Sequence, residues 1–199
     1  MPPQLYIVAG APGSGKSRAF PPSYFEVPSF NADDRSAELN GGSYQSIPLE
    51  IRSRVNREFE AFIEDHIQRR SSFAFETTLR SSITFDQMAS AARNGFEITM
   101  LYIGIEDPTI NIERVANRSA LGFHTAPTDL LLSIHARSHE NLRIACKQAF
   151  AGIFRLILHD NTAFNEAPVP VMDIGDHQRI ALREPLPNWV SRAIEEAGL

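Results

Sequence analysis

Cysteine, long apolar runs and excess positive charge are all scarce in this chain of 199 residues. Cys146 is the only cysteine, so no disulfide can form within the chain, which fits a reducing compartment. No apolar run approaches the ~20 residues that span a bilayer, and the N-terminus lacks the basic region of a signal peptide. We therefore expect a cytoplasmic protein with no membrane partner.

The charge balance argues against a nucleic-acid partner. The chain has 19 Lys and Arg against 24 Asp and Glu, a formal net charge of −5, whereas nucleic-acid binding leaves a basic footprint. The hydrophobic fraction of 43% is enough for a core. A chain of this length typically forms one domain, so we expect a single domain over residues 1–199.

Apolar runs alternate with helical patterns along the chain, which is typical of an α/β fold with a parallel sheet. The polar segment 36–47 is expected to be a mobile loop. Strands are predicted at 4–9, 26–30, 72–75, 97–103 and 153–158, helices at 15–20, 48–70, 82–94, 108–120, 127–149 and 187–197, and a hairpin at 169–174 and 178–182. The pattern predicts a mostly parallel central sheet of about five strands with helices on both faces.

A phosphate-binding loop follows the first predicted strand. The segment GAPGSGKS matches the pattern G-x-x-x-x-G-K-[ST], so the fold is expected to be that of the P-loop NTPases. Lys16 would contact the β- and γ-phosphates of ATP, and the Ser17 hydroxyl would bind Mg²⁺. The expected nucleotide-binding residues are Gly10, Ala11, Pro12, Gly13, Ser14, Gly15, Lys16, Ser17 and Arg18. The alternative is a glycine-rich turn that carries an exposed lysine.

Two acidic residues, Asp33 and Asp34, follow the strand predicted at 26–30. Open α/β sheets bind ligands at the carboxyl ends of their strands. A carboxylate there can accept a proton from an attacking hydroxyl or hold Mg²⁺ through water. The alternative is that one of the two caps a short helix at 34–39.

A polar segment follows the apolar strand at 72–75. Glu76, Thr78 and Arg80 would face the cleft beside the phosphate loop, where such groups can bind a hydroxyl-rich substrate. Glu76 also fits the acidic residue that binds Mg²⁺ at the end of a strand in P-loop proteins. The alternative is helix capping by Thr77 or Thr78 with a surface ion pair.

Two arginines lie four residues apart on the helix predicted at 108–120. Phosphoryl transfer needs cations around the transferred group, and Arg114 and Arg118 share one face of that helix. The alternative is a pair of solvated surface arginines. The segment GFH at 122–124 interrupts the helical pattern and is expected to act as a hinge or lid.

Taken in order, these motifs resemble the zeta-toxin family of P-loop kinases. The resemblance covers about residues 5–145 and is carried by GAPGSGKS, by NAD ending at Asp33, by FETTLR at 75–80, and by RV and GFH at 114–115 and 122–124. This family contains UDP-N-acetylglucosamine kinases that are the toxic halves of bacterial toxin–antitoxin pairs. The resemblance implies ATP and Mg²⁺ as cofactors, a nucleotide-sugar acceptor and an antitoxin as a possible partner.

The resemblance also implies roles for single residues. His124 stands where toxins of the family can carry a second arginine, and Arg118 or Arg137 would then supply that charge. By position, the catalytic residues are Lys16, Asp33 as base, Arg114 and Arg118, and the acceptor-binding residues are Asp33, Glu76, Thr78, Arg80 and His124.

The resulting prediction is an ATP-dependent kinase that transfers the γ-phosphoryl group to a hydroxyl of a small acceptor, with UDP-N-acetylglucosamine favoured. One alternative is a P-loop kinase for another alcohol, sugar or nucleoside, because many such kinases share this architecture. The other is an ATP-binding regulatory protein with little transfer activity.

Overall fold

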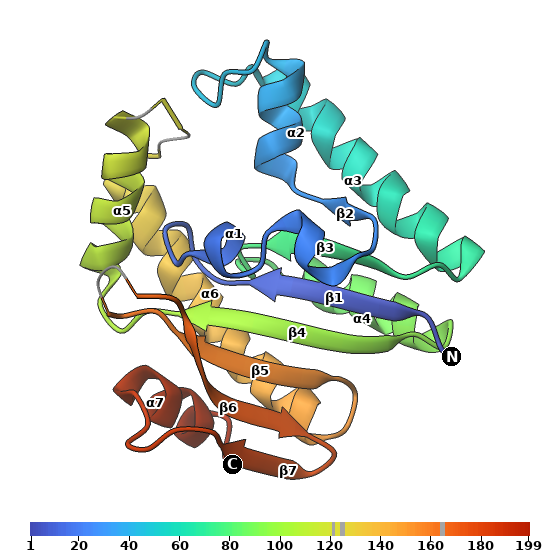
Figure 1. Cartoon of the computed structure of the whole chain (residues 1–199), viewed down its shortest axis with the longest axis vertical. Helices are drawn as coiled ribbons and strands as arrows, with labels where there is room; N and C mark the ends of the chain where they lie inside the picture. The colour runs from blue at the N-terminus through green and yellow to red at the C-terminus, as the bar shows by residue number, and fades with distance from the viewer. Residues whose placement is uncertain (121, 124–125, 164–165) are drawn as a thin grey trace.

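A seven-stranded sheet in the order β2-β3-β1-β4-β5-β6-β7 runs through the molecule (Figure 1). The computed structural model describes residues 1–120, 122–123, 126–163 and 166–199. The elements in chain order are β1 (Gln4–Ala9), α1 (Lys16–Ala19), the 3-10 helix η1 (Pro22–Phe25), β2 (Ser29–Phe30), α2 (Ala32–Leu39), α3 (Leu49–Arg69), β3 (Phe73–Thr77), α4 (Ile83–Arg93), β4 (Glu97–Gly104), α5 (Pro108–Ala120), α6 (Thr128–Phe150), β5 (Arg155–Asp160), β6 (Val169–Gly175), β7 (Gln178–Ala181) and α7 (Asn188–Glu196).

The central strands are apolar because helices cover both faces of the sheet. Strand β1 pairs in parallel with β3 and β4, and β4 pairs in parallel with β5. Leu5, Ile7, Phe73 and Met100 from these strands are buried in the core. Figure 1 shows α4 and α6 behind the sheet and α1 in front of it. The predicted α/β class with a mostly parallel sheet is confirmed.

The sheet has seven strands instead of the expected five. The hairpin predicted near the C-terminus is present as β6 and β7, and β6 pairs antiparallel with β5. Burial of Val171, Met172 and Ile174 in the core explains why the hairpin joins the sheet. The sequence identified the hairpin but gave no indication of its partner strand.

Two local predictions on the N-terminal side are also corrected. The strand expected at 26–30 is only Ser29–Phe30, since η1 precedes it and Glu26 has a left-handed φ of 55°. Part of the segment expected to be a loop at 36–47 belongs to the helix Ala32–Leu39.

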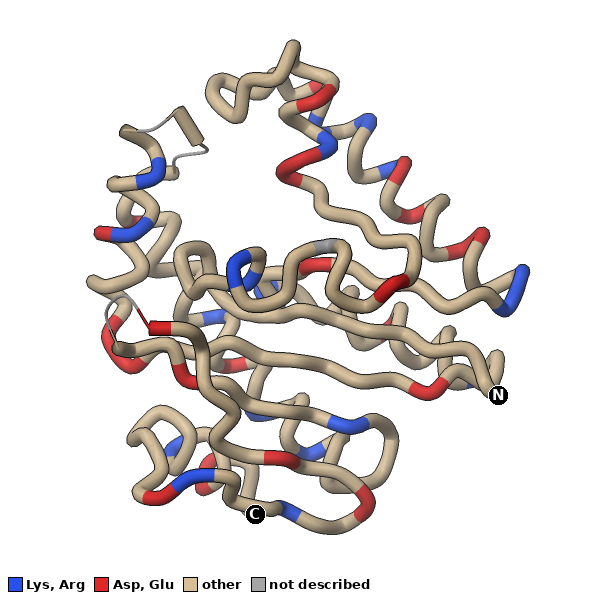
Figure 2. Tube along the Cα trace, in the orientation of Figure 1, with Lys and Arg blue, Asp and Glu red and all other residues tan. Residues whose placement is uncertain are grey.

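The carboxyl ends of the parallel strands lie at one edge of the sheet. Ala9 at the end of β1 pairs with Thr77 of β3 and Tyr102 of β4, and Gly104 pairs with Asp160 of β5. Segments that are distant in sequence therefore meet here: the phosphate loop, the residues after β3 and the residues after β5. Figure 2 shows basic positions on α1 and α5 and acidic positions at the start of α2 around this edge.

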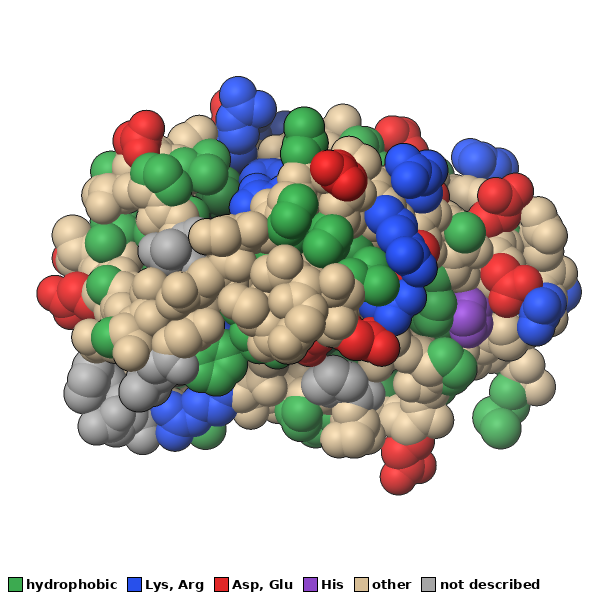
Figure 3. Space-filling model, turned by 90° about the horizontal axis from the view of Figure 1, so that it is seen from above, with side chains coloured by type: hydrophobic (Ala, Val, Ile, Leu, Met, Phe, Trp, Pro, Cys, Tyr) green, Lys and Arg blue, Asp and Glu red, His purple; other side chains and the backbone are tan. Residues whose placement is uncertain are grey.

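The view from above shows charged side chains of both signs, with several basic ones next to one another to the right of centre (Figure 3). None of the helices in the described ranges combines the length and apolar character needed to cross a bilayer. Cys146 is buried in α6, and burial raises the pKa of its thiol to about 12.

Candidate active site

The phosphate loop connects β1 to α1 and depends on glycines for its shape. Gly13 and Gly15 have left-handed φ values of 79° and 93°. A side chain at Gly13 would meet the backbone of Asn111, and one at Gly15 would meet the amide of Asn161. Only glycine combines this backbone conformation with such close neighbours. The loop is therefore packed between α5 and the segment after β5.

Lys16 is buried inside this loop. Its side chain is 7% exposed, and its Nζ donates to the carbonyl oxygens of Gly10 at 2.8 Å and Ala11 at 3.1 Å. A buried ammonium group needs such partners because desolvation is costly. This burial contradicts the alternative of a turn with an exposed lysine. The ammonium group of Lys16 lies inside the phosphate loop.

Glu76 brings the end of β3 to the phosphate loop. One of its carboxylate oxygens accepts hydrogen bonds from Ser17 Oγ at 3.0 Å and Asn31 Nδ2 at 3.2 Å. The other lies 3.6 Å from Lys16 Nζ. A carboxylate beside a hydroxyl is the kind of oxygen set that Mg²⁺ prefers. Ser17 and Glu76 together thus fit a magnesium ion. This agrees with the interpretation of Glu76 as a magnesium-binding residue.

Asn31 caps the helix that carries the acidic pair. Its side-chain oxygen accepts from the backbone N–H groups of Asp33 at 2.9 Å and Asp34 at 3.3 Å. The expected alternative, a cap formed by Asp33 or Asp34, is therefore wrong, because both lie in the first turn of α2. Asn31 also binds Glu76, so one side chain ties this turn to the phosphate loop.

The two aspartates differ in their surroundings. The Asp34 carboxylate accepts a hydrogen bond from the hydroxyl of Tyr44 at 2.9 Å, and this bond raises the pKa of that tyrosine above its usual value. The Asp33 carboxylate is exposed and accepts no hydrogen bond from any described residue. Of the two, Asp33 is the carboxylate free to accept a proton.

Arg114 of α5 lies on the opposite side of the phosphate loop. Its guanidinium donates to the carbonyl oxygens of Asn161 at 3.0 Å and Ala163 at 3.1 Å. Burial, and next the neighbouring charge of Arg18, lower the pKa of Arg114 from its ordinary value. Arg114 therefore places a positive charge beside Asn161, whose side chain contacts the phosphate loop.

Comparison with known proteins agrees with this geometry. No family model matches the chain. An uncharacterized protein of Haemophilus influenzae is 27% identical over 124 residues, which cover 61% of this chain and 85% of that protein. Among solved structures, a chain of the AvrRxo1-ORF1:AvrRxo1-ORF2 complex with ATP has a TM-score of 0.72 at 14% identity, covering 98% of this chain and 63% of its own.

A second solved structure is from the PezAT toxin–antitoxin system of Streptococcus pneumoniae. It has a TM-score of 0.61 at 14% identity and covers 98% of this chain and 78% of that chain. At 14% identity these likenesses concern the fold, and with the phosphate loop after β1 it is the fold of the P-loop NTPases. This chain spans less than two thirds of the AvrRxo1 chain that it matches, 63% of its length.

Two residues that the sequence did not single out support the phosphate loop. Asn111 Nδ2 donates to the carbonyl of Pro12 at 2.8 Å, and Asn161 Nδ2 donates to that of Ser14 at 2.7 Å. Both asparagines are buried, and their Oδ1 atoms have no partner among the described residues. Asn161 directly follows β5, which was a usable signal, whereas nothing in the sequence marked Asn111.

Arg118 lies toward the far end of α5, away from the loop. Its guanidinium is 5.1 Å from the centre of the Phe123 ring, which in turn lies 5.4 Å from the ring of Tyr44. The hinge or lid expected at 122–124 is thus in contact with the segment after α2. His124, expected to bind the acceptor, lies outside the described residues.

Of the residues after Glu76, Arg80 lies near α6. Thr78 is half-buried, and Arg80 is exposed beside α6, where it lines an open pocket with Arg137. Glu76, Thr78 and Arg80 were expected to form one acceptor cluster. Instead, Glu76 lies at the phosphate loop and Arg80 lies near α6.

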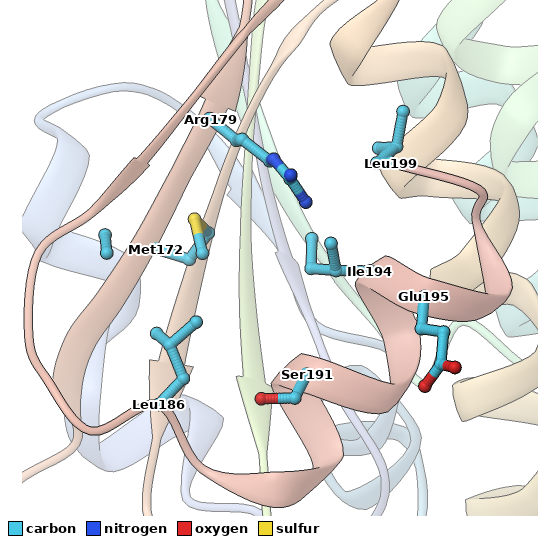
Figure 4. Close-up of a pocket in the computed structure, with 8 residues that line it drawn as sticks. Met172, Arg179, Leu186, Ser191, Ile194, Glu195 and Leu199 are labelled. Carbon is cyan, nitrogen blue, oxygen red and sulfur yellow. The ribbon is translucent and has the colours of Figure 1, made fainter.

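A separate cavity of about 520 Å³ lies between the β6–β7 hairpin and α7 (Figure 4). Met172 and Arg179 line it from the strands, and Ser191, Ile194 and Glu195 line it from the helix. None of the predicted site residues contributes to it. Among the described residues, no group of three or more His, Cys, Asp or Glu side chains could hold a metal ion.

Proposed function

We propose that this chain is an ATP-dependent kinase whose acceptor is a hydroxyl-bearing small molecule. The observation that carries the proposal is that the Glu76 carboxylate of β3 lies 3.0 Å from Ser17 Oγ and 3.6 Å from Lys16 Nζ, beside the phosphate loop. A buried cation, a hydroxyl and a carboxylate in this order are what the phosphates of ATP and their metal ion require.

The reaction is a direct transfer of the γ-phosphoryl group. The acceptor oxygen forms a bond to the γ-phosphorus, and the bond from that phosphorus to the bridging oxygen of ADP breaks. The hydroxyl proton passes to Asp33, whose carboxylate is free of hydrogen bonds from described residues. Mg²⁺, held by Ser17 and Glu76, would neutralise charge on the phosphates.

The cations around the loop stabilise the charge that is transferred. Lys16 provides one positive charge from inside the loop, and Arg114 and Arg18 provide two more from its other side. Lys16 is buried, and a preorganised charge that is shielded from water is worth more than the same charge in solution. Arg114 would need to exchange its bonds to the carbonyls of Asn161 and Ala163 for bonds to phosphate.

The favoured acceptor is a nucleotide sugar such as UDP-N-acetylglucosamine, and an antitoxin is the proposed protein partner. The fold similarity to a chain of PezAT, a toxin–antitoxin system, supports the antitoxin. The nucleotide sugar is supported by the resemblance of the segment FETTLR at 75–80 to the zeta-toxin family. The Arg80 guanidinium supports an anionic acceptor, because one guanidinium can donate two parallel hydrogen bonds to the oxygens of a phosphate group.

The test is a screen of nucleotide sugars, free sugars, nucleosides and small alcohols with ATP and Mg²⁺, read by the mass of the product. We expect one nucleotide sugar to gain a phosphoryl group and Lys16→Ala to abolish that gain while its melting temperature is unchanged. Phosphorylation of a free sugar alone would support the kinase and reject the nucleotide sugar. ATP binding with no acceptor-dependent turnover would instead support a regulatory ATP-binding protein.

A further inference from the structure

Trp189 is the only tryptophan of the chain and lies in the first turn of α7, the helix drawn in red in Figure 1. It is 1% exposed, and its ring packs against the rings of Tyr102 in β4 and His139 in α6, with centroids 5.9 Å apart in both pairs. A side-chain carbon at Gly104 would lie 2.6 Å from the indole ring. The indole therefore fills the space that this glycine leaves at the end of β4.

The indole N–H of Trp189 donates to the carboxylate of Asp160, the last residue of β5. The distance from Nε1 to Oδ1 is 2.7 Å. The same carboxylate accepts from the hydroxyl of Thr162 at 2.8 Å and from its backbone N–H at 3.3 Å. Hydrogen bonds to a carboxylate are stronger than those between neutral groups, so Asp160 fixes the start of the segment after β5.

Glu106 makes a second connection between α7 and this segment. Its carboxylate accepts from the backbone N–H of Trp189 at 2.6 Å and from the guanidinium of Arg192 at 2.7 Å. Its own backbone N–H donates to Thr162 Oγ1 at 3.2 Å. Thr162 is therefore bonded to both acidic residues that bind Trp189, and the first turn of α7 and the segment after β5 form one hydrogen-bonded unit.

Asn161 lies between the two residues of this unit, Asp160 and Thr162. Its side chain donates to the carbonyl of Ser14 in the phosphate loop at 2.7 Å, and its own carbonyl accepts from Arg114 at 3.0 Å. The position of a side chain depends on its backbone, and both neighbours of Asn161 are tied to α7. The point from which Asn161 reaches the phosphate loop therefore depends on the contacts of Trp189.

We infer that Trp189 is a positioning residue for ATP binding, which acts on the phosphate loop through Asp160 and Asn161. This inference rests on the proposed kinase function, because it names a residue that shapes the nucleotide site of that function. Trp189 lies outside the segment 5–145 that carries the family resemblance. The C-terminal helix thereby has a role in nucleotide affinity besides its packing in the core.

The test compares the binding of a non-hydrolysable ATP analogue with Mg²⁺ to the wild type and to Trp189→Phe by calorimetry. Phenylalanine keeps an aromatic ring in the core and removes the N–H that binds Asp160. We expect the dissociation constant to rise about threefold to tenfold, the usual range for residues that act on a site through others. Unchanged affinity in Trp189→Phe would overturn the inference.

The matched control is Ile194→Val, which truncates a buried residue of the same helix. It should lower the melting temperature by an amount similar to that of Trp189→Phe and change the affinity for the analogue less than about twofold. An equal loss of affinity in the two variants would show that only the stability of α7 matters, which also overturns the inference.

Variants of the intermediate residues test the route. Asp160→Ala removes the same hydrogen bond from the other partner and should weaken analogue binding at least as much as Trp189→Phe. Adding Trp189→Phe to Asp160→Ala, or to Asn161→Ala, should weaken binding less than about twofold further, because residues in one network are not additive. Full multiplication of the separate effects would reject a route through Asp160 and Asn161.

Kinetics separate this inference from the kinase proposal. With the acceptor that the screen identifies, Trp189→Phe should raise the KM for ATP about threefold to tenfold and leave the KM for the acceptor unchanged. Phosphoryl transfer with an unchanged KM for ATP would reject the positioning role and keep the kinase. If no acceptor is phosphorylated but analogue binding still depends on Trp189 and Asp160, the kinase proposal fails and the positioning role remains.

Discussion

At the scale of single residues, the choice of catalytic base depends on one tyrosine. Asp33 and Asp34 are adjacent in the first turn of α2, and both are exposed. The Tyr44 hydroxyl donates a hydrogen bond to the Asp34 carboxylate, whereas the Asp33 carboxylate has no such donor among the described residues. A general base needs an accessible lone pair, so Asp33 is the better candidate.

The matching prediction compares two conservative variants. Asp33→Asn should lower turnover by roughly 10²-fold or more with little change in ATP affinity, which is the usual effect of losing a general base. Asp34→Asn should lower turnover much less, because its carboxylate is already engaged by Tyr44. Steady-state kinetics and ATP titration of both proteins test this, and a larger loss in Asp34→Asn would show that the base is misassigned.

A second residue-scale prediction concerns Glu76. Glu76→Gln keeps the shape of the side chain and removes the charge that faces Ser17 and Lys16. If Glu76 helps to hold Mg²⁺, the concentration of Mg²⁺ for half-maximal turnover should rise about tenfold or more, because a neutral amide is a weaker ligand. The KM for the acceptor should change little. The opposite pattern, a raised acceptor KM at unchanged Mg²⁺ requirement, would place Glu76 in the acceptor site.

At the scale of secondary-structure elements, three segments hold the phosphate loop. Asn111 supports it from α5, Asn161 supports it from the segment after β5, and Glu76 faces it from β3. Arg114 extends this contact, since it binds the carbonyl of Asn161, whose side chain binds Ser14. Helix α5 is thus linked to the loop twice, directly by Asn111 and through Asn161 by Arg114.

Asn161→Ala tests this connection. Losing a buried hydrogen bond and leaving the carbonyl of Ser14 unpaired should lower the free energy of unfolding by about 1–3 kcal/mol. It should also weaken ATP binding, because the loop loses its support. The control is Asn94→Ala, which removes an exposed side-chain bond to Ser90 at the end of α4 and should have little effect on either quantity. Equal ATP affinity in Asn161→Ala and the wild type would show that the loop holds its shape without Asn161.

At the scale of the whole molecule, buried and half-buried histidines make stability depend on pH. Desolvation, and to a smaller extent the neighbouring His135, lower the pKa of His139 to about 4. Burial also lowers the pKa values of His135 and His159. The unfolded chain therefore binds protons below pH ~6.5 that the folded chain does not bind. Stability is fully present above that pH and is lost as the pH falls toward the folded pKa values.

For His139 alone, the free energy of unfolding should fall by about 2 kcal/mol between pH 7.5 and pH 5. His139→Phe should flatten the pH dependence by this amount, because the ring that must stay neutral is removed. His177→Gln, at an exposed position, should leave the dependence as in the wild type. Denaturant unfolding at a series of pH values measures these differences, and equal slopes for His139→Phe and the wild type would contradict the explanation.

The sequence alone determined the phosphate loop, the alternation of strands and helices, and the hairpin near the C-terminus. These features depend on local chemistry: glycines that accept left-handed φ values at Gly13 and Gly15, apolar runs that must be buried, and prolines and polar residues that end helices. Local rules operate over a few residues, so they can be recognised without knowing which segments later meet.

Only the tertiary structure decided which strands pair and which side chains meet at the site. The β6–β7 hairpin joined the sheet at β5, Asn31 took the cap expected of Asp33 or Asp34, and Glu76 and Arg80 diverged. The contacts of Asn161 with Ser14 and of Tyr44 with Asp34 join residues from different elements. Such contacts depend on the order of strands in the sheet and on the packing of helices across it, and neither is encoded in the spacing of residues along one segment.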